Sequence, residues 1–156
     1  MKVSRLLIAL FGATVACFLW YAVLHFLEPL LLQNVVTPAA GMDIQDWASG
    51  FEESQVVAIL VAWFLAVIWH PISFLSSGRR GDRRILWTVF QILCVLTSVI
   101  LCILLLPKTE YGAVWAYAMA FLNGLFPFWL GTVWCSQGAC KYAPMGAKSM
   151  RGFFRQ

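Results

Sequence analysis

The sequence predicts an all-α integral membrane protein with four transmembrane helices, and three observations support this fold class. The chain has 156 residues, of which 62% are hydrophobic and only 12% are charged, whereas roughly a quarter of the residues of a soluble domain are charged. The apolar residues form blocks of about 20, the length that a helix needs to cross about 30 Å of hydrocarbon. The charges lie in the gaps between these blocks. Since the backbone inside a bilayer must satisfy its own hydrogen bonds, each block is expected to be a helix.

Four apolar blocks divide the chain into a transmembrane domain, residues 1–135, and a basic cytosolic tail, residues 136–156. The longest gap, residues 28–55, is expected to form a loop on the outer side of the membrane. Pro29 is expected to end or kink the first span. The four expected spans are residues 6–27, 56–74, 85–106 and 113–135.

The distribution of Lys and Arg predicts the orientation of these spans, because cytosolic loops of membrane proteins are enriched in basic residues. With an even number of spans, both termini and the loop between spans two and three lie on one side. That side carries ten of the eleven basic residues and a net charge of +9, whereas the opposite side carries −5. We therefore expect both termini in the cytosol and the protein in the inner membrane of a bacterium.

The first span has some features of a cleavable lipoprotein signal, since small residues precede Cys17 after a basic start. However, Thr14 stands where such signals usually carry Leu, and the apolar run continues to Leu27. Cleavage after Ala16 would leave that run stranded outside the membrane. We therefore expect Met1 to Ala16 to be retained as part of a span.

The outer loop contains a predicted short amphipathic helix, residues 43–54, in which apolar residues recur at near-helical spacing between acidic ones. Trp47 and Phe51 would point into the acyl boundary of the outer leaflet. Glu52 and Glu53 precede span two, where carboxylates favour a helix N-terminus. Two interpretations remain: a surface helix that leads into span two, or a docking site for a partner outside the membrane.

Polar and small residues cluster on one face of three spans, which predicts helix contacts, because such residues drive helix association in lipid. In span three, a face within about 80° contains Gln91, Cys94, Ser98 and Cys102. In span four, the corresponding groove contains Ala116, Ala120, Gly124, Pro127 and Gly131, with Asn123 at its border. Span one adds alanines at positions 9, 13 and 16. These faces are enough to close a bundle, and some of them can serve other subunits instead.

The sequence contains no constellation typical of catalysis, metal binding or ion coupling. No Asp, Glu, Lys or Arg lies deep inside an expected span, whereas buried ionisable residues are the usual mark of proton relays and ion-coupled transport. His25 and His70 are expected at opposite membrane faces, as interfacial residues that cannot share a metal, and Pro71 is expected to break the second span. The outer loops contain no cysteine, and there is no pair of intramembrane carboxylates or glycine-rich phosphate loop. We therefore expect no enzymatic activity and no cofactor.

The basic residues of the cytosolic side are expected to contact lipid headgroups or a cytosolic partner. They also carry the orientation signal, and nucleic-acid binding is not expected. This set comprises Arg79, Arg80, Arg83, Arg84, Lys148, Arg151 and Arg155.

The sequence favours a non-catalytic membrane subunit of a multi-protein inner-membrane complex, such as secretion, conjugation or transport machinery. The reasons are its small size, its packing faces and the absence of a catalytic, metal-binding or ion-coupling constellation. Such a subunit would act in assembly and anchoring, so its expected partners are membrane lipids and other integral membrane subunits. The alternatives are the small membrane subunit of a solute transporter and a pore formed by self-association. The layout is similar to the four-span small subunit of tripartite periplasmic-binding-protein-dependent carriers, through Glu52, Glu53 and the loop from His70 to Arg84. In this sequence no Arg follows the acidic pair in span two, and the basic tail is additional.

Overall fold

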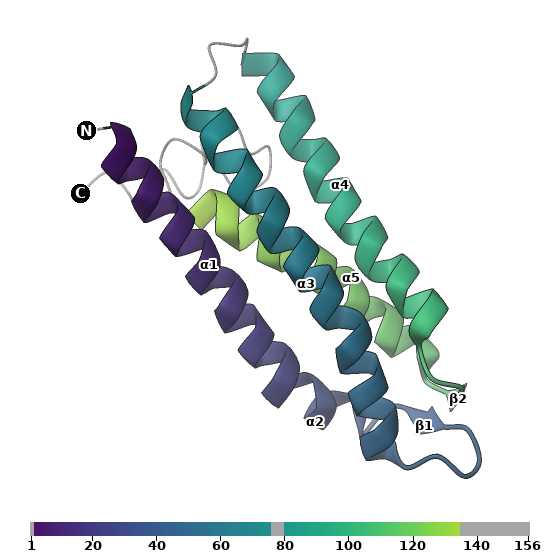
Figure 1. Cartoon of the computed structure of the whole chain (residues 1–156). Helices are drawn as coiled ribbons and strands as arrows, with labels where there is room; N and C mark the ends of the chain where they lie inside the picture. Colours follow the sequence, from purple (N-terminus) through teal and green to yellow (C-terminus); the bar gives the residue numbers. More distant parts are fainter. Residues whose placement is uncertain (1, 76–79, 135–156) are drawn as a thin grey trace.

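The computed structural model describes residues 2–75 and 80–134, and every structural statement below refers to these two ranges. Four long helices lie side by side in one bundle (Figure 1). They are α1 (Lys2–Phe26), α3 (Ile44–Leu75), α4 (Arg80–Leu105) and α5 (Ala113–Trp129), and a π-helix, η1 (Leu130–Trp134), follows α5. Four segments are long and apolar enough to cross a membrane, namely Leu6–Leu32, Ile44–Ser73, Arg84–Leu105 and Ala113–Val133. This confirms the predicted all-helical fold with four candidate spans.

The helix of the first span breaks close to Pro29, as the sequence predicts. α1 ends at Phe26, and the short helix α2 (Glu28–Leu32) begins after a single intervening residue. Pro29 lies in the first turn of α2, where a helix does not need the N–H group that proline lacks. The amide of Leu27 still donates to the carbonyl of Val23 at 2.9 Å. The junction is therefore a local break, and it places Glu28 at the edge of the bundle core.

The second span differs from the expectation, because α3 is one continuous helix of 32 residues. The predicted separate amphipathic helix, residues 43–54, is wrong: this segment is the first part of α3. Trp47 and Phe51 are 0% and 2% exposed, and their rings stack at 5.8 Å, so they pack inside the protein and do not point into lipid. The expected break at Pro71 is also absent, since α3 continues to Leu75.

Two short strands, which the sequence did not predict, join the loops at one end of the bundle. β1 (Thr37–Pro38) pairs antiparallel with β2 (Thr109–Tyr111), and both lie at the end where α2 finishes and α3 begins (Figure 1). Gly112 follows β2 with a φ of +84°, and a Cβ there would collide with the carbonyl oxygen of Val35. Both the backbone conformation and the close contact therefore require glycine at this position.

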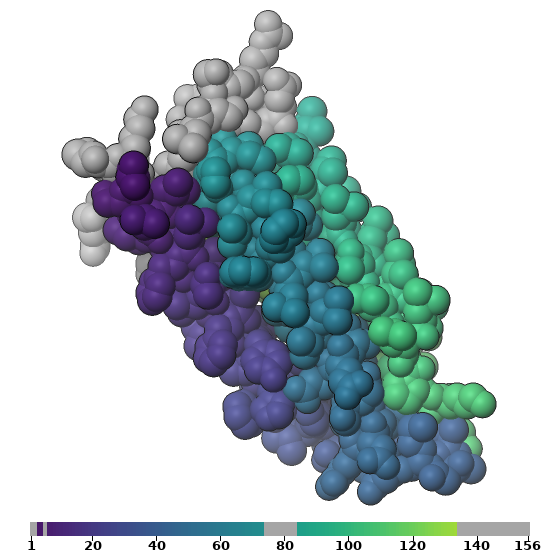
Figure 2. All heavy atoms as spheres, viewed as in Figure 1, coloured from purple at the N-terminus to yellow at the C-terminus, as the bar shows by residue number. Residues whose placement is uncertain are grey.

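The core of the bundle consists of two clusters, one towards each end. The cluster near the strands includes Trp47, Phe51 and Ala120, and the other includes Trp69, Trp87 and Phe128. Figure 2 shows the broad face that α1, α3 and α4 present together. Large apolar side chains are exposed along these helices, as a lipid-facing surface requires.

Candidate functional site

A buried polar network connects all four long helices in the half of the bundle nearer to the strands. The side-chain nitrogen of Asn123, on α5, donates to Glu28 Oε2 at 3.2 Å and to Gln55 Oε1 at 3.4 Å. The indole N–H of Trp20, on α1, donates to Asn123 Oδ1 at 2.9 Å. Because an indole nitrogen can only donate, this bond fixes the orientation of the Asn123 amide. Its nitrogen must therefore face Glu28 and Gln55.

The network continues from Gln55 to α4 through Ser98. Ser98 Oγ lies 2.6 Å from Gln55 Oε1 and also 2.6 Å from the backbone oxygen of Ala120. A hydroxyl carries one proton, so it cannot donate to both oxygens at once. On the other side, the Gln55 side-chain nitrogen donates to Ser54 Oγ at 3.0 Å, and the Ser54 hydroxyl donates to a backbone carbonyl. Because Gln55 Oε1 also accepts from Asn123, both oxygens have a donor when the Ser98 hydroxyl donates to Ala120.

Burial distinguishes this network from a polar surface patch. Glu28 is 3% exposed, and Gln55, Ser98 and Asn123 are fully buried. Sequence reasoning singled out Ser98 and Asn123 as packing residues but missed Glu28 and Gln55. The sequence predicts Glu28 in the outer loop, although Leu27 precedes it and three leucines follow Pro29. That flanking pattern is the signal that would have placed this carboxyl group within the apolar segment.

A contact between His25 and Glu52, which is an ion pair when the histidine is protonated, lies beside the network at the same end of the bundle. His25 Nδ1 is 2.8 Å from Glu52 Oε1, and the two side chains are 48% and 22% exposed. The ring of Tyr21 stacks on His25. Exposed pairs of this kind contribute little to stability, typically about 0–1 kcal/mol. His25 is about half exposed, and Glu53 is exposed.

His70 belongs to a second polar cluster at the opposite end, and its burial corrects the expectation of an interfacial residue. The ring is fully buried, and Nε2 lies 3.0 Å from the carbonyl oxygen of Gly131 in η1. Beside it, the indole of Trp87 donates to Thr132 Oγ1 at 2.9 Å. A π-helix changes the backbone hydrogen-bond register, which fits a carbonyl in η1 that bonds to a side chain.

Gln91 lies at the bottom of a groove between α4 and α5. Its nitrogen donates to the carbonyl oxygens of Gly124 and Leu125, both at 3.2 Å. Its oxygen is buried and has no hydrogen-bond partner among the described residues. The groove has a volume of about 410 Å³ and is lined by Trp87, Thr88, Gln91, Ile92, Val95, Leu96, Phe121 and Leu125. Turning the amide over would place its oxygen against two carbonyl oxygens, so the observed orientation is the favourable one.

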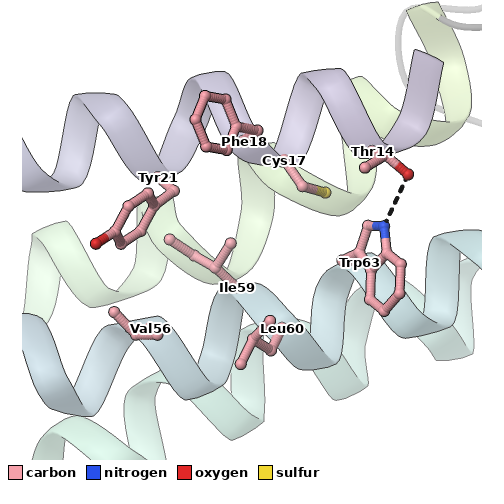
Figure 3. A pocket seen from close by; sticks show the side chains of 8 residues that line it. All are labelled: Thr14, Cys17, Phe18, Tyr21, Val56, Ile59, Leu60 and Trp63. Carbon is pink, nitrogen blue, oxygen red and sulfur yellow. Dashed lines mark hydrogen bonds between the residues drawn. The ribbon is translucent and has the colours of Figure 1, made fainter. Parts of the chain in front are cut away.

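A second groove, of about 380 Å³, lies between α1 and α3 (Figure 3). At one end, the indole of Trp63 donates to Thr14 Oγ1 at 3.0 Å. The other side chains that line it are Cys17, Phe18, Tyr21, Val56, Ile59 and Leu60. These residues give the groove an almost entirely apolar surface, which suits contact with acyl chains.

The predicted site residues fall into three groups. The helix-packing set, Gln91, Ser98, Ala116, Ala120, Asn123, Gly124 and Gly131, is buried throughout. Of the set expected to contact the outer leaflet or a partner, Trp47 and Phe51 are internal, while Glu52 and Glu53 reach the surface. In the basic set only Arg84 has a described side chain, and it is exposed. The side chains of Arg79, Arg80, Arg83, Lys148, Arg151 and Arg155 lie outside the described residues, as do Cys135 and Cys140.

Metal binding finds no support within the part of the chain that the structure describes. No group of three or more His, Cys, Asp or Glu side chains is close enough to hold a metal ion there. Cys17, Cys94 and Cys102 are buried and form no disulfide.

No protein-family model matches this chain, and no curated protein or solved structure matches it either.

Proposed function

We propose that this chain is a non-catalytic integral membrane subunit of a multi-protein inner-membrane complex, and that a helix of another subunit packs into the α4–α5 groove. The single observation that supports this is the amide of Gln91, whose oxygen lacks a partner although the side chain lines the groove. An unsatisfied acceptor is costly where water is absent. The Gln91 oxygen is covered in this structure, so the groove walls must open slightly before a Ser, Thr, Asn or Gln side chain on a partner helix can supply the missing donor.

The walls of this groove suit a neighbouring helix. Ile92, Leu96 and Phe121 are 51%, 50% and 47% exposed, and they surround the buried amide. A helix in this position would contact apolar side chains on two sides and one polar group at the centre. Transmembrane helix pairs are stabilised by this combination of close packing and an interhelical hydrogen bond.

Purification in mild detergent from the native host, with identification of the co-purifying subunits, tests this role. We expect defined membrane subunits to accompany the wild-type chain, to be reduced with Gln91→Leu and to be lost with Leu96→Trp, which fills the groove. The matched controls are Gln33→Leu, at an exposed glutamine, and Leu104→Trp, at an exposed leucine of the same helix. Both should retain the partners. A stable, monodisperse monomer from the native membrane would contradict the proposal.

A second candidate, the small membrane subunit of a solute transporter, is favoured by the burial of Glu28. A carboxyl group inside a membrane bundle is costly, and such groups commonly mark ion or substrate pathways. In this case Glu28→Gln would abolish transport while the complex still assembles. Loss of assembly together with transport would favour the first candidate.

We also propose that the end of the bundle where α1 begins and α3 meets α4 faces the cytosol of a bacterium. The charge asymmetry of the sequence supports this orientation. Reporter fusions after Ser77 and after Tyr111 would test it, because only the first should report a cytosolic position. The opposite pattern would show that this end of the bundle faces away from the cytosol, while the helix packing described above would stay the same.

A further inference from the structure

The groove between α1 and α3, called the α1–α3 groove below, is a hollow with a buried floor and open rims. Cys17 and Ile59, which form part of its lining, are each 4% exposed, whereas Phe18 and Leu60 are 68% and 56% exposed. The hollow therefore opens onto the apolar outer surface of the bundle. Within a bilayer, an apolar group is the favourable occupant of such a hollow.

One end of the α1–α3 groove leads directly to a pair of ionisable side chains. His25 lies one helical turn beyond Tyr21 of α1, and Glu52 lies one turn before Val56 of α3, so each extends one wall of the groove. His25 Nδ1 is 2.8 Å from Glu52 Oε1, and both side chains reach the surface. An apolar hollow that ends at a pair of exposed charged groups matches the layout of a lipid, an apolar chain with a polar headgroup.

The length of the α1–α3 groove favours an acyl chain over a helix as its occupant. The bond from the Trp63 indole to Thr14 joins the two helices at the other end (Figure 3). Between Thr14 and Tyr21 the groove is about 10 Å long, at 1.5 Å per residue. A transmembrane helix needs about 30 Å, so it cannot lie in the groove along its whole length. One acyl chain, within the leaflet nearer to the strands, can do so.

Charge selects the headgroup. Among the described residues at this end of the bundle, the basic side chains are His25 and Lys108 alone. The exposed acidic side chains there are Asp43, Asp46, Glu53 and Glu110, in addition to the partly exposed Glu52. The resulting negative potential repels an anionic headgroup and attracts one that carries a positive group.

We propose that the α1–α3 groove binds a phospholipid whose headgroup carries a primary ammonium group, of the phosphatidylethanolamine type. Its acyl chain occupies the groove. Glu52 uses Oε1 for His25, so Oε2 can accept a hydrogen bond from the ammonium group. A protonated His25 donates through both ring nitrogens, with Nδ1 to Glu52 and Nε2 to the lipid phosphate. This inference does not depend on the assembly role proposed for the α4–α5 groove.

Native mass spectrometry of the full-length protein in mild detergent provides the test. The protein is mixed with equal amounts of phosphatidylethanolamine, phosphatidylglycerol and phosphatidylcholine that carry the same acyl chains. We expect phosphatidylethanolamine to be retained with about tenfold preference, the effect of one hydrogen bond to a charged group. Phosphatidylcholine has no N–H to donate, and phosphatidylglycerol has no positive group. Any other ranking, or no retained lipid, would overturn the proposal.

Substitutions at the two ends of the lipid separate the headgroup from the chain. Glu52→Gln, which keeps the shape of the side chain, should abolish the preference, whereas Glu53→Gln, at an exposed carboxylate, should keep it. Leu60→Trp, which fills the groove, should reduce retention of all three lipids. Val57→Trp is its matched control, because Val57 is 47% exposed on the same helix and does not line the groove.

A smaller substitution keeps the test decisive if Leu60→Trp does not fold, since Leu60→Phe should give a partial loss of lipid. An unchanged preference in Glu52→Gln would overturn the assignment of the headgroup. Unchanged retention in the folded Leu60 variants would overturn the assignment of the groove. None of these residues lines the α4–α5 groove, so loss of lipid and loss of partner subunits are distinguishable.

Discussion

Gly124 of α5 lies directly against the backbone of α4, and a Cβ at this position would lie 2.5 Å from the Cα of Val95 and 2.8 Å from the carbonyl oxygen of Cys94. Backbone atoms cannot move aside as a flexible side chain can. The two helices therefore approach each other as closely as they do only because residue 124 has no side chain, which is the usual role of small residues between membrane helices.

Replacing Gly124 by alanine should therefore destabilise the bundle by about 1–3 kcal/mol, the typical cost of overpacking a core. Gly131→Ala is the matched control, because its Cβ would lie 3.4 Å from the Ala66 Cβ, an ordinary contact. It should be neutral or gain up to about 1 kcal/mol from helix propensity. Unfolding in mixed detergent, followed by tryptophan fluorescence, measures both. Equal effects of the two substitutions would show that the close contact at Gly124 is not needed.

Asn123→Leu should cost about 2–4 kcal/mol, because Glu28, Gln55 and the Trp20 indole would each lose a hydrogen-bond partner in the core, and an unsatisfied buried group costs about 1–3 kcal/mol. The control is Asn34→Leu, since Asn34 is exposed and bonds only to the nearby carbonyl of Leu30. The same unfolding assay serves for both. A loss no larger than that of the control would mean that the polar network contributes no net stability.

Trp47→Ala should cost about 3–5 kcal/mol, the range for removing a large aromatic side chain from a core. This side chain is fully buried, and its indole N–H donates to Thr109 Oγ1 at 2.9 Å, which ties α3 to β2. Trp115→Ala should change stability little, since Trp115 is 53% exposed. If Trp47 instead anchored a surface helix in lipid, the two substitutions would have similar effects.

The three described cysteines should resist alkylation in the folded protein. Cys17 is 4% exposed, and Cys94 and Cys102 are fully buried. With Cys135 and Cys140 replaced by serine, we expect a maleimide to add nothing in mild detergent and to modify three thiols after unfolding, as measured by intact mass. Tyr111→Cys is the positive control, because residue 111 is 75% exposed and lies in β2, outside the apolar spans. Rapid modification of native Cys94 or Cys102 would contradict the packing of α4.

The four helices could be predicted from the sequence because length and hydropathy determine membrane spans almost alone. The packing faces of α4 and α5 were also predictable, since small and polar residues at helical spacing within a membrane span usually face other helices. The start of α3 was not predictable from the sequence. Four acidic residues between positions 43 and 53 suggested a surface segment, whereas tertiary contacts bury the apolar residues between them.

The candidate site was predictable only in part, because it depends on contacts between distant segments. Glu28 and Asn123 are 95 positions apart in sequence, and no local pattern indicates that they meet. The burial of His70 has the same origin, since its partner is a carbonyl of η1. A π-helix has no reliable sequence signature, so this partner was not visible from the residues alone.

The continuity of α3 has a mechanical consequence. At 1.5 Å per residue its 32 residues make a rod of about 48 Å, which exceeds the about 30 Å of a bilayer core. One end of this rod is bonded to β2 through Trp47 and Thr109, and the other to η1 through His70 and Gly131. A displacement of the paired strands β1 and β2 would therefore be transmitted through α3 to η1, because a continuous helix is stiffer than a flexible loop.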